Sequence, residues 1–291
     1  MARGFALLAA LTMLPPQAPA QEKATFRSGV QTVMLHATVR SDDGHLVPDL
    51  TRDDFEVRDE GQPVEITVFS SDPQPITVVL LLDMSGSMER HFLRVRDSTR
   101  HFIDALQPGD RARIGSFGVE VALSPWLTSD KRILHRVVSE ELWPGGGTPL
   151  WNSVYGAMQS LDRESGRRVI LALTDGIGNM DLPGLEGSSR QARDKAEDDG
   201  FMVYAIGVEG SPLDASITSL AERTGGGFFK LETGADLSRT FLRVVEELRH
   251  QYVIGFAPPK ADGKMHDVDV KVKKPRMTAR ARKNYRAPGG R

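Results

Sequence analysis

Residues 76–88 read ITVVLLLDMSGSM, and this stretch is the strongest indication of the fold class. The run up to Leu82 is apolar without a break, which is typical of a strand buried on both faces at the centre of a parallel sheet. The strand ends at Asp83, and a D-x-S-x-S pattern then places Ser85 and Ser87 on a tight loop. Open α/β sheets bind ligands at the carboxyl ends of their strands, so the sequence predicts a ligand site on this loop.

Two further segments belong with this loop. WPGGGTPLW (143–151) places Thr148 after three glycines, and RRVILALTDG (167–176) places Asp175 at the end of a second apolar run. If the two runs are parallel strands of one sheet, Asp83 and Asp175 emerge at the same edge, where the loop of Thr148 can close over them. Oxygen-only ligands suit a hard cation such as Mg²⁺, with Mn²⁺ or Ca²⁺ as alternatives.

Each of these polar residues also has a simpler structural explanation. Ser85 and Ser87 lie where a helix is expected to begin, and serine is a favoured N-cap. Thr148 followed by proline is an ordinary N-cap pair, and Asp175 followed by glycine is an ordinary turn. Capping does not explain why two buried strands both end in aspartate. Capping and metal ligation are also compatible, because a hydroxyl has lone pairs for both.

The pattern resembles the metal-ion-dependent adhesion site of the von Willebrand factor type A domain, which uses a D-x-S-x-S, a distant Thr and a distant Asp. All five positions match in order: Asp83, Ser85, Ser87, Thr148 and Asp175. The resemblance implies that Mg²⁺ takes oxygens from the serines and the threonine, with the aspartates bound directly or through water. It also implies one open coordination position for a carboxylate of a partner protein.

The hydrophobic pattern divides the chain into three segments. Residues 28–70 alternate as short strands, residues 76–250 alternate between strands and helices, and residues 251–286 return to alternating strands. We expect three strands at each end, too few to be stable alone, so the two ends should pair into one domain. The predicted fold class is α/β: a doubly wound, mostly parallel sheet, Rossmann-like in outline, inserted in a small β-sandwich built from the N- and C-terminal segments.

The first twenty residues are predicted to be a secretory signal peptide. Arg3 precedes an apolar run at 5–14, and Ala18-Pro19-Ala20 forms a small-x-small cleavage signal. Cleavage after Ala20 would make the mature protein secreted or periplasmic, although an uncleaved signal anchor stays open. The later apolar runs are short, so no transmembrane segment is expected after cleavage.

The amino-acid composition indicates a globular protein. Hydrophobic residues make up 40% and charged residues 26% of the 291, typical of a globular protein with one large or two modest domains. The chain has no cysteine and so no disulfide.

The net charge is −2, but residues 260–291 hold 11 Lys and Arg against 3 Asp. This basic tail indicates either an anionic partner or a solvated β edge. Nucleic-acid binding is not expected, because only Tyr285 interleaves the basic residues.

The wider layout resembles the secreted VWFA-related proteins expanded in Acidobacteria. The stretches that carry this likeness are DLTRDDFEVRDEGQPVEI (49–66), YVIGFAPP (252–259) and the terminal R-x-R-x-x-Y of Arg280, Arg282 and Tyr285.

The sequence favours a metal-dependent binding module whose partner protein presents an Asp or Glu, and not an enzyme. One alternative is a metal-dependent hydrolase or phosphatase with Asp83 as nucleophile, but no lysine or histidine near the motif offers a base or a phosphate clamp. The other alternative is a structural envelope protein with a vestigial metal site.

Overall fold

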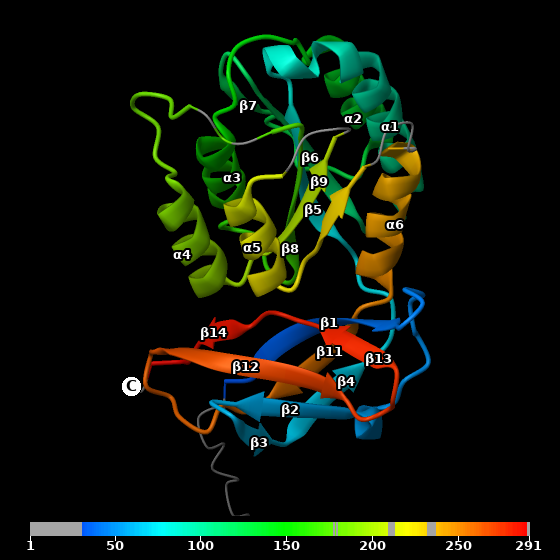
Figure 1. Cartoon of the computed structure of the whole chain (residues 1–291), viewed down its shortest axis with the longest axis vertical. Helices are drawn as coiled ribbons and strands as arrows, with labels where there is room; N and C mark the ends of the chain where they lie inside the picture. The colour runs from blue at the N-terminus through cyan, green and yellow to red at the C-terminus, as the bar shows by residue number, and fades with distance from the viewer. Residues whose placement is uncertain (1–30, 177, 179, 209–212, 232–236, 290–291) are drawn as a thin grey trace, which may run out of the picture. The chain divides into compact units, whose positions relative to one another are not determined.

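Strand β5 (Thr77–Asp83) lies inside a six-stranded sheet in the computed structural model of the chain, which describes residues 31–176, 178, 180–208, 213–231 and 237–289 (Figure 1). The strand order is β10-β9-β8-β5-β6-β7, and all neighbours are parallel except β6 and β7. The other strands of this sheet are β6 (Arg111–Phe117), β7 (Val121–Leu123), β8 (Arg168–Thr174), β9 (Met202–Gly207) and β10 (Phe228–Lys230).

The apolar run of β5 is buried on both faces, as the sequence predicts. Val78, Leu80 and Leu82 belong to one core and Val79 and Leu81 to another, and all five are 0% exposed. The alternation follows from the two-residue period of a strand. Burial of each such side chain stabilises the fold by about 1.5–3 kcal/mol, which explains why this strand anchors the sheet.

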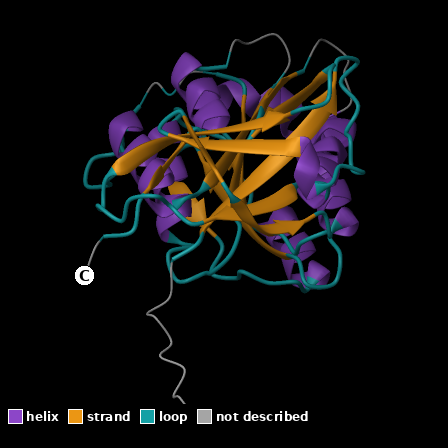
Figure 2. Cartoon of the chain, turned by 90° about the horizontal axis from the view of Figure 1, so that it is seen from below, coloured by secondary structure: helices purple, strands orange, loops and turns teal. Residues whose placement is uncertain are grey.

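Helices cover both faces of the sheet (Figures 1 and 2). One core joins the sheet to α1 (Phe92–Ala105), α2 (Lys131–Glu140) and α6 (Leu237–Arg249). The second core joins it to α3 (Leu150–Gln159), α4 (Ser189–Asp199) and α5 (Ala215–Arg223). The predicted doubly wound α/β architecture is therefore confirmed.

The two ends of the chain form a pair of antiparallel sheets around a third core (Figure 1). The first sheet, in the order β13-β1-β11-β4, contains β1 (Val33–Ser41), β4 (Ile66–Ser70), β11 (Tyr252–Phe256) and β13 (Met277–Arg280). The second, in the order β14-β12-β2-β3, contains β2 (Phe55–Asp59), β3 (Gln62–Val64), β12 (Met265–Val272) and β14 (Asn284–Arg286). Each sheet combines N- and C-terminal strands, which confirms that the α/β segment is inserted between two halves of a sandwich.

The strand count at the ends needs correction. Three strands were expected at each end, but the described residues form β1 to β4 before the insertion and β11 to β14 after it. The N-terminal strands change sheet between β1 and β2 and again at Glu65, and the C-terminal strands change sheet at each step from β11 to β14. Val64, Ile66 and Val68 read as one alternating run although they lie on two strands, because alternation specifies which face is buried and not which strand is the neighbour. In the central sheet, β6 ends at Phe117, and the antiparallel edge strand β7 follows it at Val121–Leu123.

A buried ion cluster ties the sandwich to the α/β segment. Glu247 of α6 has a fully buried side chain that pairs with Arg40 of β1, Nη2 to Oε2, at 2.9 Å. Its other oxygen pairs with Arg280 of β13 and accepts a hydrogen bond from the hydroxyl of Tyr204 at 3.3 Å. A buried carboxylate is tolerated because two guanidiniums and a phenol satisfy it.

The segment boundaries drawn from the sequence stay a prediction. Residues from Gln31 onward form one compact unit, and the predicted signal peptide, 1–20, lies outside the described residues. Among the described helices, none is long and apolar enough to cross a bilayer.

Candidate metal site

The predicted site residues lie at the carboxyl edge of the parallel sheet. Asp83 is the last residue of β5, and Asp175 directly follows the neighbouring parallel strand β8. After β5 the chain turns into a short 3-10 helix, Gly86–His91, with Ser85 in its N-cap position. The Ser85 side chain makes no capping hydrogen bond, so the capping explanation of this serine does not hold.

A chain of hydrogen bonds connects three of the predicted ligands. The hydroxyls of Ser85 and Ser87 are 3.1 Å apart, and the Ser87 hydroxyl donates to Oδ1 of Asp175 at 3.0 Å. Ser87 is exposed, whereas Ser85 and Asp175 are buried, at 2% and 6% exposure. The structure therefore brings residues from two strand ends together at a point that solvent can reach.

Asp83 lies beneath the hydrogen-bonded Ser85, Ser87 and Asp175 and is fully buried. Its Oδ1 accepts from the backbone N–H of Ser85 at 2.9 Å, and its Oδ2 accepts from the Thr174 hydroxyl at 2.6 Å. Thr174 is a positioning residue that the sequence interpretation missed. The signal was present, because Thr174 is the last residue of a buried strand and directly precedes Asp175.

The glycine loop that carries Thr148 is attached to the Asp83 loop by two backbone hydrogen bonds. Gly86 donates to the carbonyl of Gly146 at 3.1 Å, and Gly145 donates to the carbonyl of Met84 at 2.7 Å. Thr148 is 4% exposed. Helix α3 has Pro149 in its N-cap position, so Thr148 precedes the cap instead of forming it.

The electrostatics of Asp83 suit a cation. Burial raises the pKa of its carboxyl group, the nearby Asp175 raises it further, and hydrogen bonds from Ser85 and Thr174 oppose the rise. Two carboxylates and three hydroxyls form an all-oxygen set, which fits a hard divalent cation. The described part of the chain holds no cluster of three or more His, Asp or Glu suited to a metal.

Two solved structures show the same fold at low sequence identity. A von Willebrand factor type A protein from Catenulispora acidiphila aligns with a TM-score of 0.54 and 14% identity, covering 91% of this chain and 75% of that one. Proximal thread matrix protein 1 from the mussel byssus, solved with a zinc-occupied MIDAS motif, aligns with a TM-score of 0.53 and 19% identity, covering 66% of this chain. The chain spans 50% of the mussel protein's length. No curated protein matches the sequence.

Fold and loops together define an open α/β protein with a cluster of hydroxyl and carboxylate oxygens at the carboxyl edge of its parallel sheet. Residues 77–243 match the von Willebrand factor type A domain, and the chain belongs to that family.

The glycine loop leads to a first prediction. Gly146 has a φ of +80°, and a Cβ there would lie 2.4 Å from the backbone nitrogen of Val119. Gly146→Ala is therefore expected to displace the loop and to weaken Mn²⁺ binding by about tenfold or more, the usual effect of losing the support of a metal ligand. Calorimetric titration with Mn²⁺ measures the affinity.

Gly156→Ala provides the control for this loop. Gly156 lies in α3, where an added Cβ would have no atom within 4 Å, and alanine favours helix. This variant should bind Mn²⁺ as the wild type does. If folded Gly146→Ala protein also kept wild-type affinity, attachment of the glycine loop would be irrelevant to the site.

Proposed function

We propose that this protein is a metal-dependent binding module that holds Mg²⁺, or Mn²⁺ or Ca²⁺, through Asp83, Ser85, Ser87, Thr148 and Asp175. Its ligand is an Asp or Glu side chain of a partner protein. The observation that carries the proposal is the hydrogen-bonded array of Ser85, Ser87 and Asp175 above the buried Asp83.

The residues of the proposed metal site have different roles. Ser85 and Thr174 hold the carboxylate of Asp83 in place, and each of its oxygens keeps a lone pair for a further contact. The hydroxyls of Ser85 and Ser87 add oxygens without adding charge. A bound Mg²⁺ would therefore keep enough positive charge to attract an incoming carboxylate. The exposed Ser87 places the binding position within reach of a partner.

Apolar side chains beside the glycine loop favour a protein as the partner. Val119 is 72% exposed and Trp143 is 75% exposed. Val119 borders the loop, since a Cβ on Gly145 would lie 3.3 Å from its Cγ2, and Trp143 is two residues before Gly145. Exposed aromatic and branched side chains next to a polar site are typical of protein interfaces.

The partners of Asp83 give no support to the hydrolase alternative and favour a protein that is not an enzyme. Phosphoryl transfer to an aspartate needs a base or a positively charged phosphate clamp beside the nucleophile, whereas the hydrogen-bond donors to Asp83 are the neutral Ser85 N–H and the Thr174 hydroxyl. The vestigial alternative differs in one measurable respect, because a vestigial site would not bind a divalent cation.

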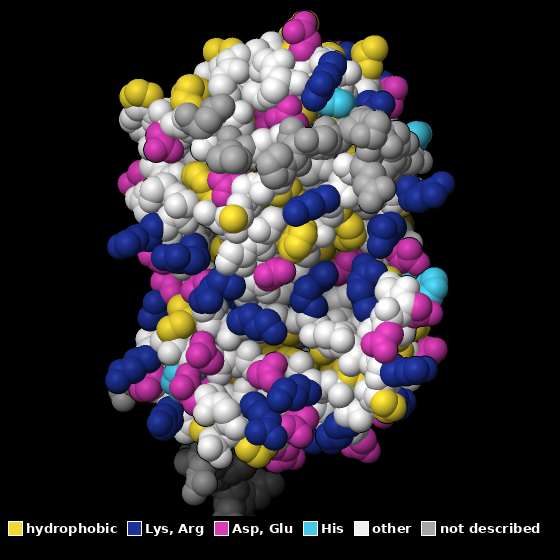
Figure 3. All heavy atoms as spheres, viewed as in Figure 1, with side chains coloured by type: hydrophobic (Ala, Val, Ile, Leu, Met, Phe, Trp, Pro, Cys, Tyr) yellow, Lys and Arg dark blue, Asp and Glu magenta, His cyan; other side chains and the backbone are white. Residues whose placement is uncertain are grey.

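The proposal also covers the compartment, the subfamily and nucleic acid as a partner. We place the mature protein in a secreted or periplasmic compartment after cleavage behind Ala20, and we assign it to the VWFA-related proteins that residues 49–66 and 252–259 resemble. Nucleic acid is not proposed as a partner. On the face in Figure 3, Lys and Arg side chains are interspersed with Asp and Glu, which is unlike a nucleic-acid surface.

Binding to the partner is expected to require both the metal and the Thr148 hydroxyl. Tagged protein incubated with envelope extract should retain a partner in Mg²⁺ and lose it in excess EDTA. Thr148→Ala should reduce retention at least tenfold because it removes one of the proposed ligand oxygens, and far-UV circular dichroism checks that the variant is folded. Free glutamate at high concentration should release the partner, and glutamine should not.

The matched control is Ser219→Ala, which removes an exposed hydroxyl on α5. It should behave as the wild type. Retention that persists unchanged in EDTA would contradict the proposal, as would Asp83-dependent turnover in a broad phosphatase screen.

A further inference from the structure

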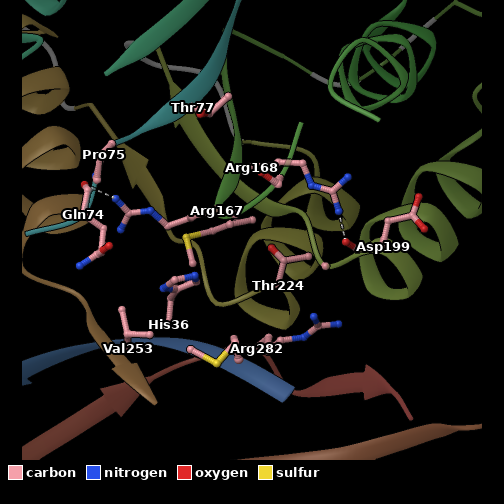
Figure 4. Close-up of a pocket in the computed structure, with 15 residues that line it drawn as sticks. His36, Gln74, Pro75, Thr77, Arg167, Arg168, Asp199, Thr224, Val253 and Arg282 are labelled. Atoms are coloured by element: carbon pink, nitrogen blue, oxygen red, sulfur yellow. Dashed lines mark hydrogen bonds between the residues drawn. The ribbon is translucent and has the colours of Figure 1, made fainter. Parts of the chain in front are cut away.

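A second candidate site lies at the opposite edge of the central sheet. A cavity of about 610 Å³ is lined there by the first residues of three parallel strands, Thr77, Arg168 and Met202. Its opposite wall comes from the antiparallel strands β1 and β11, through His36 and Val253 (Figure 4). We call this space the arginine cavity, because Arg167, Arg168 and Arg282 all line it.

The arginine cavity is positively charged. Its lining includes one carboxylate residue, Asp199, whose side chain points away from the cavity in Figure 4 and binds Lys195 at 2.9 Å. Among the described residues, Arg167, Arg168 and Arg282 have backbone carbonyls and a side-chain amide as hydrogen-bond acceptors, and none forms an ion pair with a carboxylate. Carboxylates act on them only without an ion pair: Glu197 and Asp198 on Arg282, and Asp110 on Arg167.

Two buried nitrogen atoms at the cavity have no partner in the described structure. They are Nε of Arg167, a residue only 8% exposed, and Nδ1 of His36. Burial, and then the charges of Arg167 and Arg282, lower the pKa of His36 to about 4, so its ring is neutral at pH 7. Leaving a buried polar atom unpaired costs about 1–3 kcal/mol, which a ligand able to reach it would recover.

The remaining wall is apolar. Met34, Met202 and Val253 contribute to it, and methionine adapts its shape to different ligands. The volume falls in the range of about 300–1,000 Å³ that is usual for small-molecule sites. Gly200, at a φ of +75°, leaves room for the guanidinium of Arg282, since a Cβ there would lie 2.8 Å from Nη1.

We propose that the arginine cavity binds a small organic anion, a carboxylate carried on an apolar body. Guanidinium groups recognise carboxylates with paired hydrogen bonds, and the carboxylate would supply the direct ion pair that these arginines lack in the fold. The methionine wall receives the apolar part. This site is separate from the proposed metal site, at the other end of the same strands, and does not depend on it.

Octanoate is the probe that tests the proposal, with octan-1-ol as its uncharged control and inorganic phosphate as an anion without an apolar body. In the wild-type protein, octanoate should shift the methyl resonances of Met34 and Met202 and the ring resonances of His36, and should raise the pKa of His36. Octan-1-ol and phosphate should each bind at least tenfold more weakly. Equal binding of octanoate and octan-1-ol, or phosphate binding as tight as octanoate, would overturn the proposal.

Substitutions of single arginines test where the carboxylate of octanoate binds. Arg282→Gln and Arg168→Gln should each weaken octanoate binding about tenfold or more. Arg132→Gln is the control and should not weaken it, because Arg132 lies on α2 outside the cavity lining and its side chain is 89% exposed. Far-UV circular dichroism checks the fold of each variant. Because the wild-type resonances report the same site without any substitution, absence of octanoate-induced shifts would overturn the proposal even if a variant failed to fold.

Discussion

Replacing Glu247 with alanine is expected to lower the free energy of unfolding by about 3–5 kcal/mol, the usual cost of breaking a buried ion pair by removing one partner. Glu247 has a fully buried carboxylate between Arg40 and Arg280, with the Tyr204 hydroxyl as a further donor. Its removal leaves two partly buried guanidiniums and a buried phenol without their acceptor. Because these groups belong to the sandwich and to the α/β segment, the loss should weaken the attachment between them.

Urea denaturation measures this effect, and the adjacent residue supplies the control. Glu246 is exposed on the same helix, so Glu246→Ala should change stability by no more than about 0.5 kcal/mol. A Glu247→Ala variant as stable as Glu246→Ala would show that the buried cluster contributes nothing to holding the two parts together.

Much of the central sheet could be predicted because its signals are local. The unbroken apolar runs of β5 and β8 require burial on both faces, which places them inside a parallel sheet with covering helices. Once two parallel strands are neighbours, Asp83 and Asp175 at their ends must share an edge. The hydrogen bonds through Ser85 and Ser87 agree with that expectation. Whether these residues bind a metal stays a prediction.

Other features depend on contacts between distant parts of the chain and could not be predicted. The change of sheet at Glu65 is determined by pairing of β3 with β2 and of β4 with β11. The edge strand β7 has three residues, too few for a periodic pattern to specify it. Glu247 resembles any helix-surface glutamate until Arg40 and Arg280 arrive from strands at opposite ends of the sequence.

The second large effect concerns the metal. The Asp83→Ala/Asp175→Ala double variant is expected to lose at least 100-fold in Mg²⁺ or Mn²⁺ affinity, since it removes both carboxylates from a site whose other ligands are neutral hydroxyls. The wild type should also be stabilised by the metal, by about 2.7 kcal/mol at a concentration 100 times Kd, and the double variant should not. Asp181→Ala is the matched control. It removes an exposed carboxylate that is not one of the proposed ligands, and it should retain wild-type affinity.

Calorimetric titration with Mn²⁺ measures directly whether the five proposed ligand residues form a metal site. The wild type and Asp181→Ala should each bind one ion, and the Asp83→Ala/Asp175→Ala double variant should show no binding over the same concentration range. Equal binding by the wild type and the double variant, or no binding by either, would contradict the assignment of a metal site to Asp83, Ser85, Ser87, Thr148 and Asp175.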